Sequence, residues 1–269
     1  METTRREMIA TASTIAAGAA GTAFAANAAE SGTKSAFYEL RYYRMRTDHT
    51  EQGRRTAAFL TSGYLPAAKK AGAGLIGLFG SVIAPESPFI LCLTSYPSLD
   101  MMETVREKLA VSEEYQKALA DYNSGEPGFV RMESWLLRAF DFFPGIELTP
   151  AAADGKRPPR IYELRTYQAL QESYAQRKIK MFGSGEVEIF RSVGLQPVWF
   201  GQALVGANLP HLTYMVAFEN MAARDVAWNG FRAHPKWLEL QRNPEFSMPG
   251  LSSNISNSIL SAMNGSEIR

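Results

Sequence analysis

The sequence predicts an α+β fold in which two tandem ferredoxin-like (βαββαβ) units pack sheet to sheet as a barrel within one chain. Three observations lead to this prediction. The phrase FYELRYY at 37–43 returns as IYELRTY at 161–167, an offset of 161 − 37 = 124 residues. Each copy is followed by strand and helix signals in the same order. A segment rich in Pro, Gly and Ala, 142–159, separates the two copies and indicates a linker.

The first unit is predicted to span 36–141. A β-branched and aromatic run opens it, and a helical pattern follows. Two further strand-like runs then form a hairpin, a second helix begins after Ser98 or Asp100, and a last strand closes the unit. The predicted elements are a strand at 37–43, a helix at about 50–71, strands at 75–83 and 89–96, and a strand at 129–139.

The second unit is predicted to span 160–263 with the same order. Gly72 and Gly194 stand where the long helix of each unit should stop. Asn220 is the expected start of the second helix here. The predicted elements are a strand at 161–167, a helix at about 171–193, strands at 196–205 and 211–218, and a strand at about 252–261. At the repeat offset of 124, ESWLLRAF from Glu133 aligns with NSILSAMN from Asn257.

This order is that of a ferredoxin-like unit, which has its helices on one face of a four-stranded sheet. The other face must also be covered. Two units in one chain meet this need if their bare faces pack together. We therefore expect an eight-stranded barrel.

The repeated phrase predicts a polar strip. Alternate residues of a strand point to opposite faces, so Tyr-Leu positions share one face and Glu-Arg-Tyr positions share the other. We assign the leucines to the helices and the Glu-Arg-Tyr face to the space between the sheets. A buried Glu and Arg must be paired. The strip is either an ion pair that sets the register or the lining of a ligand pocket. Its residues are Glu39, Arg41, Tyr43, Glu163, Arg165 and Tyr167.

Composition excludes some functions. The chain has 269 residues, with 28 basic and 27 acidic side chains and a net charge of +1. This balance argues against nucleic acid as a partner. The basic pairs Arg54-Arg55 and Arg177-Lys178 are interpreted as solvated helix faces. The single cysteine, Cys92, lies in the run FILCLTSY and is predicted to be buried.

Residues 1–29 are predicted to be a cleaved signal peptide of the twin-arginine type. Arg5 and Arg6 precede an uncharged stretch rich in Ala, Gly and Thr, and A-x-A spacings follow. A membrane anchor would need roughly 20 strongly apolar residues. We therefore expect a periplasmic or secreted protein with no stable membrane insertion after cleavage.

The other motifs do not predict a particular cofactor. GAGLIG at 72–77 has the spacing of a dinucleotide loop, but a helix precedes it and a strand follows, the reverse of what that loop needs. No two of His49, His211 and His234 lie close enough in sequence for a local metal site, so none is predicted. His234 precedes Pro235 and is expected to be a cap or hinge. His211 is expected near a barrel mouth, and Trp199 either in the core or at the floor of a ligand cavity.

The motifs YELRTY, EVEIFRSVGLQPVWFG and LTYMVAFENMAARDVAWNGFRAHPKWLEL resemble the NIPSNAP family, and the first unit keeps YELRYY and the same layout. The resemblance implies tandem units of the dimeric α+β barrel class. It carries over no catalytic residue set.

Three functions remain open. The first is binding of a small apolar or aromatic molecule between the sheets. Its candidate ligand contacts are Glu39, Arg41, Tyr43, Glu163, Arg165, Tyr167, Trp199 and His211. The second is an enzyme, as cofactor-independent oxygenases and haem proteins of this class are. The third is a structural or partner-binding module, with homo-oligomers formed through exposed sheet edges.

Overall fold

The computed structural model describes residues 35–48, 50–148 and 160–269, and the part from Thr33 to Arg269 is one compact unit. The predicted signal peptide, 1–29, and His49 lie outside the described residues. The first βαββαβ unit comprises β1 (Phe37–Arg44), α1 (Thr50–Ala58), the π-helical turn η1 (Phe59–Tyr64), α2 (Leu65–Ala71), β2 (Ile76–Ile83), β3 (Phe89–Tyr96), α3 (Leu99–Val111), α4 (Glu113–Asn123) and β4 (Arg131–Ala139).

The second unit repeats this order. It comprises β5 (Ile161–Gln168), α5 (Glu172–Met181), the π-helical turn η3 (Phe182–Glu186), α6 (Val187–Ser192), β6 (Gln196–Val205), β7 (His211–Phe218), α7 (Met221–Ala233), α8 (Pro235–Arg242) and β8 (Asn254–Ala262). The predicted layout of both units is therefore confirmed in every strand.

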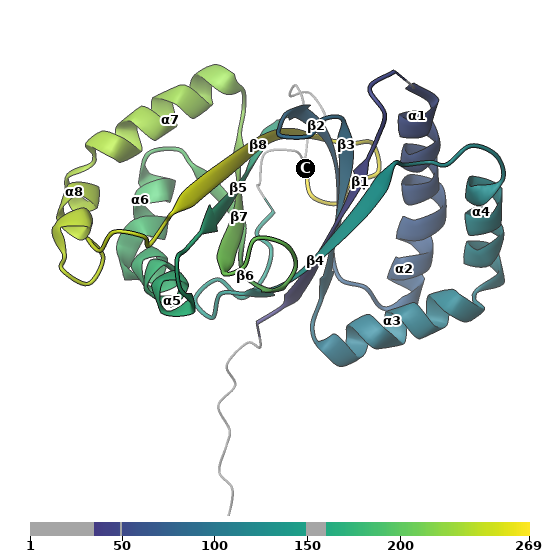
Figure 1. Cartoon of the computed structure of the whole chain (residues 1–269), viewed down its shortest axis with the longest axis horizontal. Coiled ribbons are helices and arrows are strands. Elements are labelled where there is room, and N and C mark those ends of the chain that lie inside the picture. The colour runs from purple at the N-terminus through teal and green to yellow at the C-terminus, as the bar shows by residue number, and fades with distance from the viewer. Residues whose placement is uncertain (1–34, 49, 149–159) are drawn as a thin grey trace, which may run out of the picture. The chain divides into compact units, whose positions relative to one another are not determined.

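The eight strands form one closed antiparallel barrel in the order β1-β3-β2-β8-β5-β7-β6-β4. The two units join through the pairs β2–β8 and β4–β6. Helices α1–α4 lie on one side of the strands and α5–α8 on the other (Figure 1). Each described strand pairs on both sides, so closure of the barrel leaves the described strands no free sheet edge. A homo-oligomer stays a prediction, and its contact would have to use another surface.

Local sequence explains where the helices begin and end. The side chains of Ser98 and Asn220 accept hydrogen bonds from the backbone of the first turn, at 3.1 Å and 2.9 Å, as N-caps do. Gly72 follows α2 in the left-handed region at φ +113°, which Gly adopts without strain. The second helix of each unit is two helices, because Ser112 caps a new helix in one unit and His234 with Pro235 starts a new one in the other.

The predicted orientation of the repeated phrase is wrong. Tyr38, Leu40 and Leu164 pack in the barrel interior with side chains from both units. Tyr43 and Tyr167 instead lie in two separate clusters with the helices. Arg106 and Arg224 reach the helix-facing side from the helices and compensate the buried carboxylates there. The large apolar side chains therefore take the interior, and the Glu-Arg pairs take the helix side.

The strand registers also correct the proposed repeat alignment at the last strand. Leu40 lies opposite Trp135, and Leu164, its counterpart, lies opposite Ser258. Trp135 and Ser258 are therefore equivalent, an offset of 258 − 135 = 123 rather than 124. A slip of one residue changes the face of every side chain in a strand.

The linker predicted at 142–159 is structured over its first part. Phe143 is buried among the second unit's aromatic side chains, and Ile146 packs against the barrel interior. The backbone nitrogen of Glu147 donates to the carbonyl of Val198 at 2.8 Å.

Among the described residues, no helix has the length and apolar character that crossing a membrane requires.

Candidate functional site

In the first unit, Glu39 is buried between the sheet and the helices. Its carboxylate accepts hydrogen bonds from Arg41 on its own strand at 2.9 Å and from Arg106 of α3 at 3.1 Å. Ser134 and Tyr96 donate at 3.1 Å and 3.3 Å. Each carboxylate oxygen is therefore satisfied, as a buried charge requires.

In the second unit, Glu163 has tighter partners. Arg224 of α7 donates through Nε and Nη2, both at 2.8 Å, in a bidentate arrangement. Arg165 donates at 2.7 Å and the indole nitrogen of Trp228 at 2.7 Å. The Arg165 guanidinium also lies 4.4 Å from the Trp228 ring. The Glu and Arg of each phrase, expected to be paired because they are buried, pair with each other in both units.

These partners set the charge of both carboxyl groups. Burial by itself raises the pKa of Glu39, but Arg41, Arg106 and Ser134 outweigh it, so the pKa is lowered. Burial likewise opposes ionisation of Glu163, and the contacts with Arg224, Arg165 and Trp228 again lower its pKa. Both carboxyl groups are ionised scaffold anions rather than proton donors near neutral pH.

A second ion pair lies beside Glu163 in the second unit only. Lys178 of α5 and Glu186, at the end of the π-helical turn η3, are 5% and 1% exposed. The Lys178 ammonium donates to the two Glu186 carboxylate oxygens at 2.7 Å and 3.0 Å. Burial raises the pKa of Glu186, and Lys178 and Arg165 only partly oppose this. Interpreting Arg177-Lys178 as a solvated face is thus wrong for Lys178.

Aromatic rings surround this ion pair. The Lys178 ammonium lies 4.5 Å from the Phe182 ring, 5.3 Å from the Trp237 ring and 5.7 Å from the Tyr167 ring. The Tyr167 hydroxyl accepts hydrogen bonds from Arg165 at 3.2 Å and 3.3 Å and contacts the Tyr214 hydroxyl at 2.8 Å. A continuous polar path therefore connects Glu163, Arg165 and the two tyrosines, with the Lys178–Glu186 pair alongside.

The ion pair and Tyr167 line a pocket of about 430 Å³ between α5, α8 and the segment that leads to β8. We call it the second-unit cleft. Its wall combines aromatic and aliphatic side chains with polar groups in nearly equal share, so it can contact both an apolar body and a polar substituent. The lining residues are Tyr167, Lys178, Met181, Glu186, Phe231, Trp237, Gln241, Phe246, Ser247, Met248, Gly250, Leu251, Ser252 and Ile255.

The corresponding space in the first unit is filled. Thr56 and Tyr64 stand at the same distances before Gly72 as Lys178 and Glu186 stand before Gly194. Tyr122 of α4 stacks on Phe59, with ring centroids 4.5 Å apart, and its hydroxyl contacts the Thr56 hydroxyl at 2.8 Å. Side chains of the protein itself occupy this space.

The remaining predicted residues lie in the barrel interior, away from the cleft. Trp199 is fully buried and packs on Tyr38, with centroids 5.3 Å apart. Its position is thus in the core, one of the two expected. His211 begins β7 as predicted, is buried, and lies 5.0 Å from the Trp135 ring. The structure therefore divides the eight predicted residues among three places, one per unit and one between the sheets.

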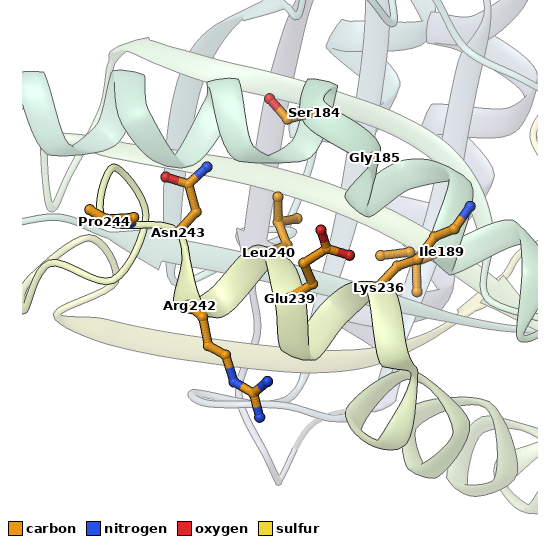
Figure 2. A pocket seen from close by; sticks show the side chains of 9 residues that line it. All are labelled: Ser184, Gly185, Ile189, Lys236, Glu239, Leu240, Arg242, Asn243 and Pro244. Atoms are coloured by element: carbon orange, nitrogen blue, oxygen red, sulfur yellow. The ribbon is translucent and has the colours of Figure 1, made fainter.

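A second hollow lies on the surface between η3, α6 and α8. Figure 2 shows Ser184 and Gly185 on one side and Lys236, Glu239 and Leu240 of α8 on the other. Its charged side chains Lys236 and Glu239 are exposed, so it lacks the buried charges of the cleft. Among residues 35–48, 50–148 and 160–269, no cluster of three or more His, Cys, Asp or Glu side chains could hold a metal ion.

The sequence profile of one family, NIPSNAP, matches the chain twice, at residues 38–144 and 162–266. The chain belongs to the NIPSNAP family. The two matched segments coincide with the two βαββαβ units, so this NIPSNAP protein carries the family domain in tandem. No curated protein sequence matches it significantly.

Solved structures share the fold of this NIPSNAP chain. A protein provisionally named a monooxygenase from Lactobacillus acidophilus has 10% identity and a TM-score of 0.53, covering 85% of this chain and 94% of that chain. A similarly named protein from Fusobacterium nucleatum has 7% identity and a TM-score of 0.53, over 86% and 94%. An anthrone oxidase-like protein has 11% identity and a TM-score of 0.50, over 87% and 93%. These likenesses show a ferredoxin-like dimeric α+β barrel.

Sequence reasoning missed Lys178 and Glu186, which line this NIPSNAP protein's cleft, and it missed Arg224 and Trp228, which hold Glu163. Lys178 and Glu186 are eight residues apart (186 − 178), which an ordinary α-helix places about 80° apart around its axis. The π-helical turn between them changes this angle, so helical spacing does not predict their contact. The missing signal was the comparison of equivalent positions, where the first unit has Thr56 and Tyr64 instead of charged residues.

Proposed function

We propose that this protein binds a small, largely apolar aromatic molecule in the second-unit cleft. The observation that carries the proposal is the aromatic pocket beside the buried Lys178–Glu186 pair, at a position where the first unit is filled by Tyr122. The expected ligand is the one predicted from the sequence. Its proposed site differs from the predicted one: it is the cleft rather than the inter-sheet space, and Tyr167 is the member of the repeated phrases that lines it.

The chemistry of the wall supports a ligand with one polar group on an aromatic body. Phe231, Trp237 and Phe246 offer apolar contact, and such rings contribute most of the binding energy in pockets of this kind. Tyr167 and Lys178 both line this space, so a hydroxyl or carbonyl group of the ligand can find a polar partner there. A simple phenol such as 2-naphthol has this pattern.

The test is calorimetric titration of the purified protein with 2-naphthol, together with native mass spectrometry of any ligand that copurifies. Trp237→Ala is expected to weaken 2-naphthol binding by about tenfold or more, because it removes an aromatic wall. Tyr115→Ala is the matched control, since Tyr115 holds the equivalent position in the first unit. Equal losses in both variants, or no binding to the folded protein, would contradict the proposal.

A catalytic function is the second candidate, and Glu186 favours it. A buried carboxyl group with a raised pKa at a pocket wall can take a proton from a substrate near neutral pH. Solved structures with the same fold include proteins provisionally named as monooxygenases. The corresponding reaction here is removal of a proton from a phenolic or enolisable ring compound, with Glu186 as the base and Lys178 stabilising the anion that forms.

This candidate is tested by deuterium exchange at the ring carbons of 2-naphthol in heavy water, followed by NMR. Glu186→Gln should abolish any exchange that the protein accelerates and leave 2-naphthol binding intact. Exchange at the uncatalysed rate with the unaltered protein would exclude this reaction. A visible absorbance band in the purified protein would instead favour the haem-binding alternative. Absence of any bound small molecule would favour the structural-module alternative.

We also propose export through the stretch that contains Arg5 and Arg6, which has the composition of a twin-arginine signal. In a bacterial host, the full chain should appear in the periplasm or medium in shortened form. Replacing both arginines with lysine should retain it inside the cell at full length. Export that is unaffected by this change would refute a twin-arginine route.

A further inference from the structure

The mouth of the barrel holds another pocket, separate from the cleft and from the groove between η3, α6 and α8. It has a volume of about 570 Å³ and lies where β1 and β5 end, between the two sheets. We call it the mouth pocket. Its lining residues are Tyr42, Arg44, Pro85, Glu86, Phe89, Glu133, Trp135, Leu164, Thr166, Gln168, Ala207, Asn208, Asn254, Ser256 and Ser258.

The repeat explains why space is left at this mouth. In the first unit, Tyr42 lies opposite Glu133 and Leu40 opposite Trp135. In the second unit, the same strand positions pair Thr166 with Ser256 and Leu164 with Ser258. The first unit therefore contributes large side chains to the mouth, and the second contributes small hydroxylated ones at the equivalent positions. The pocket is the volume that this difference leaves.

The wall from the first unit is aromatic. The ring centroids of Tyr42 and Trp135 are 5.2 Å apart, and those of Tyr42 and Phe89 are 5.4 Å apart. The Arg44 guanidinium lies 4.9 Å and 4.8 Å from the Tyr42 and Phe89 rings, which fixes its position. The rings are tilted to one another, by 55° between Tyr42 and Trp135 and by 66° between Tyr42 and Phe89. Tyr42 and Phe89 are buried and Trp135 is half-buried, so the Trp135 ring is the one that can stack against a ring compound.

The charges at the rim neutralise one another. Arg44 pairs with Glu133 at 3.3 Å and with Glu86 at 4.0 Å. Arg131 pairs with Glu133 at 2.8 Å and also with Glu86. Two arginines thus compensate two glutamates, and the rim has no uncompensated charge to attract an ionic ligand.

The wall from the second unit is neutral and rich in hydrogen-bonding groups. Gln168, Asn208 and Asn254 supply carboxamides, and Ser256 and Ser258 supply hydroxyls. Each of these groups both donates and accepts, which matches the capacity of a ligand hydroxyl. A site built in this way discriminates strongly between a hydroxylated compound and an analogue that lacks the hydroxyl.

Below the pocket, hydroxyl groups lead from the lining to a buried histidine. Thr166, which lines the pocket, contacts Thr213 at 2.9 Å, and Thr213 contacts His211 Nδ1 at 3.2 Å. His211 is buried and does not line the pocket, and the backbone at Ala207, a pocket residue, contacts its ring. The histidine therefore lies beneath the floor of the pocket, and Thr166 is the member of this chain that a ligand can reach.

From the aromatic wall, the compensated rim and the neutral amide and hydroxyl wall, we propose that the mouth pocket binds a neutral ring compound with several hydroxyl groups, of the saccharide class. The ring stacks on Trp135, and its hydroxyl groups bond to the second unit's side chains. This site is separate from the cleft of the proposed function and does not depend on it.

The test uses neutral disaccharides, maltose and cellobiose, with glucuronate and glucosamine as charged comparators. Saturation-transfer NMR and calorimetry on the purified protein are expected to show binding of at least one neutral probe and weaker binding of both charged ones. Ser258→Trp places the first unit's residue at the equivalent position, fills the pocket, and should abolish binding. Trp237→Ala, in the cleft, is the control and should leave binding unchanged.

Failure of every neutral probe to bind at millimolar concentration would overturn the proposal, as would preferential binding of a charged probe. Unchanged affinity in a folded Ser258→Trp variant would also overturn it. Thermal unfolding establishes folding of each variant. If Ser258→Trp does not fold, Trp135→Leu decides instead: removing the stacking ring should weaken binding by about tenfold, and no change in affinity would refute the site.

Discussion

The two units place the same Glu-Arg-Tyr phrase on the same kind of strand, yet they use the adjoining space differently. In the first unit, Tyr122 stacks on Phe59 and fills the space between sheet and helices. In the second unit, the Lys178–Glu186 pair and a ring of aromatic side chains border a pocket. One copy is a packed core, and the other is a cleft with buried charge.

This difference separates scaffold from site. Glu39 and Glu163 are held by arginines in both units, so their ion pairs belong to what the repeat needs in order to fold. The Lys178–Glu186 pair has no counterpart at the equivalent positions Thr56 and Tyr64. A buried ion pair is rarely the most stabilising solution for a core, so its presence in one copy alone is a reason to look for function there.

The largest expected effect comes from breaking the unrepeated pair. Glu186→Ala leaves the Lys178 ammonium buried without its partner and should lower the free energy of unfolding by about 3–5 kcal/mol, as removal of one member of a buried pair does. Urea unfolding measures it. The control is Glu245→Ala, which breaks the exposed Lys180–Glu245 pair and should change stability by less than about 1 kcal/mol. Equal losses in the two variants would show that the buried pair contributes no more to stability than an exposed one.

The next effect compares the repeated pairs. Glu163→Gln should cost about 2–3 kcal/mol and Glu39→Gln about 1–2 kcal/mol, because Arg224 is 20% exposed whereas Arg106 is 48% exposed. Both carboxyl pKa values are lowered on folding. Their contribution is therefore present above about pH 4.3 and is lost as pH falls through the folded pKa. The free energy of unfolding of the two variants should depend less on pH in that range than that of the unaltered protein. A larger loss of stability in Glu39→Gln than in Glu163→Gln would contradict the ranking.

The third effect is a pH dependence from the second unit only. His211 stands where the first unit has Phe89, and burial lowers its pKa from 6.5 to about 4, with backbone contacts at Leu212 and Ala207 opposing part of the shift. A depressed folded pKa gives stability that is present above pH 6.5 and is lost as pH falls towards 4.

Between pH 7 and pH 4.5 this loss should be about 2 kcal/mol. His211→Phe copies the first unit and should remove that slope. An unchanged slope in His211→Phe, measured by urea unfolding at both pH values, would show that His211 is not its source.

The smallest effect concerns the filled copy. Tyr122→Phe keeps the stacking on Phe59 and removes only the hydroxyl contact with Thr56, so it should cost about 1 kcal/mol. Packing would then be what closes the first unit's space. A cost above about 3 kcal/mol would mean that the polar contact holds it closed instead.

Much of the fold followed from the sequence because it depends on local signals. The recurrence of Tyr-Glu-Leu-Arg, the glycines Gly72 and Gly194 and the caps Ser98 and Asn220 predicted the order and bounds of the elements within a few residues. The face of the phrase did not follow, because alternation divides a strand into two sets without saying which set meets which layer. That choice depends on arginines that arrive from helices about 60 residues away in the chain, Arg106 for Glu39 and Arg224 for Glu163.

The candidate sites depend on tertiary structure in the same way. Tyr167 and His211 were named from the sequence, but their environments were not. Lys178 looks like any surface lysine until the fold buries it against Glu186 and Trp237. The mouth pocket exists only because two units of unequal side-chain size meet around one barrel.

By itself, the sequence determined that this protein is a doubled βαββαβ chain, because periodicity and helix ends are encoded in neighbouring residues. Only the tertiary structure decided where the Glu-Arg strips point, which copy keeps an open cleft and what lines the barrel mouth. The reason is physical: burial and charge compensation depend on contacts between residues distant in the chain, and those contacts exist only once the two units have closed the barrel.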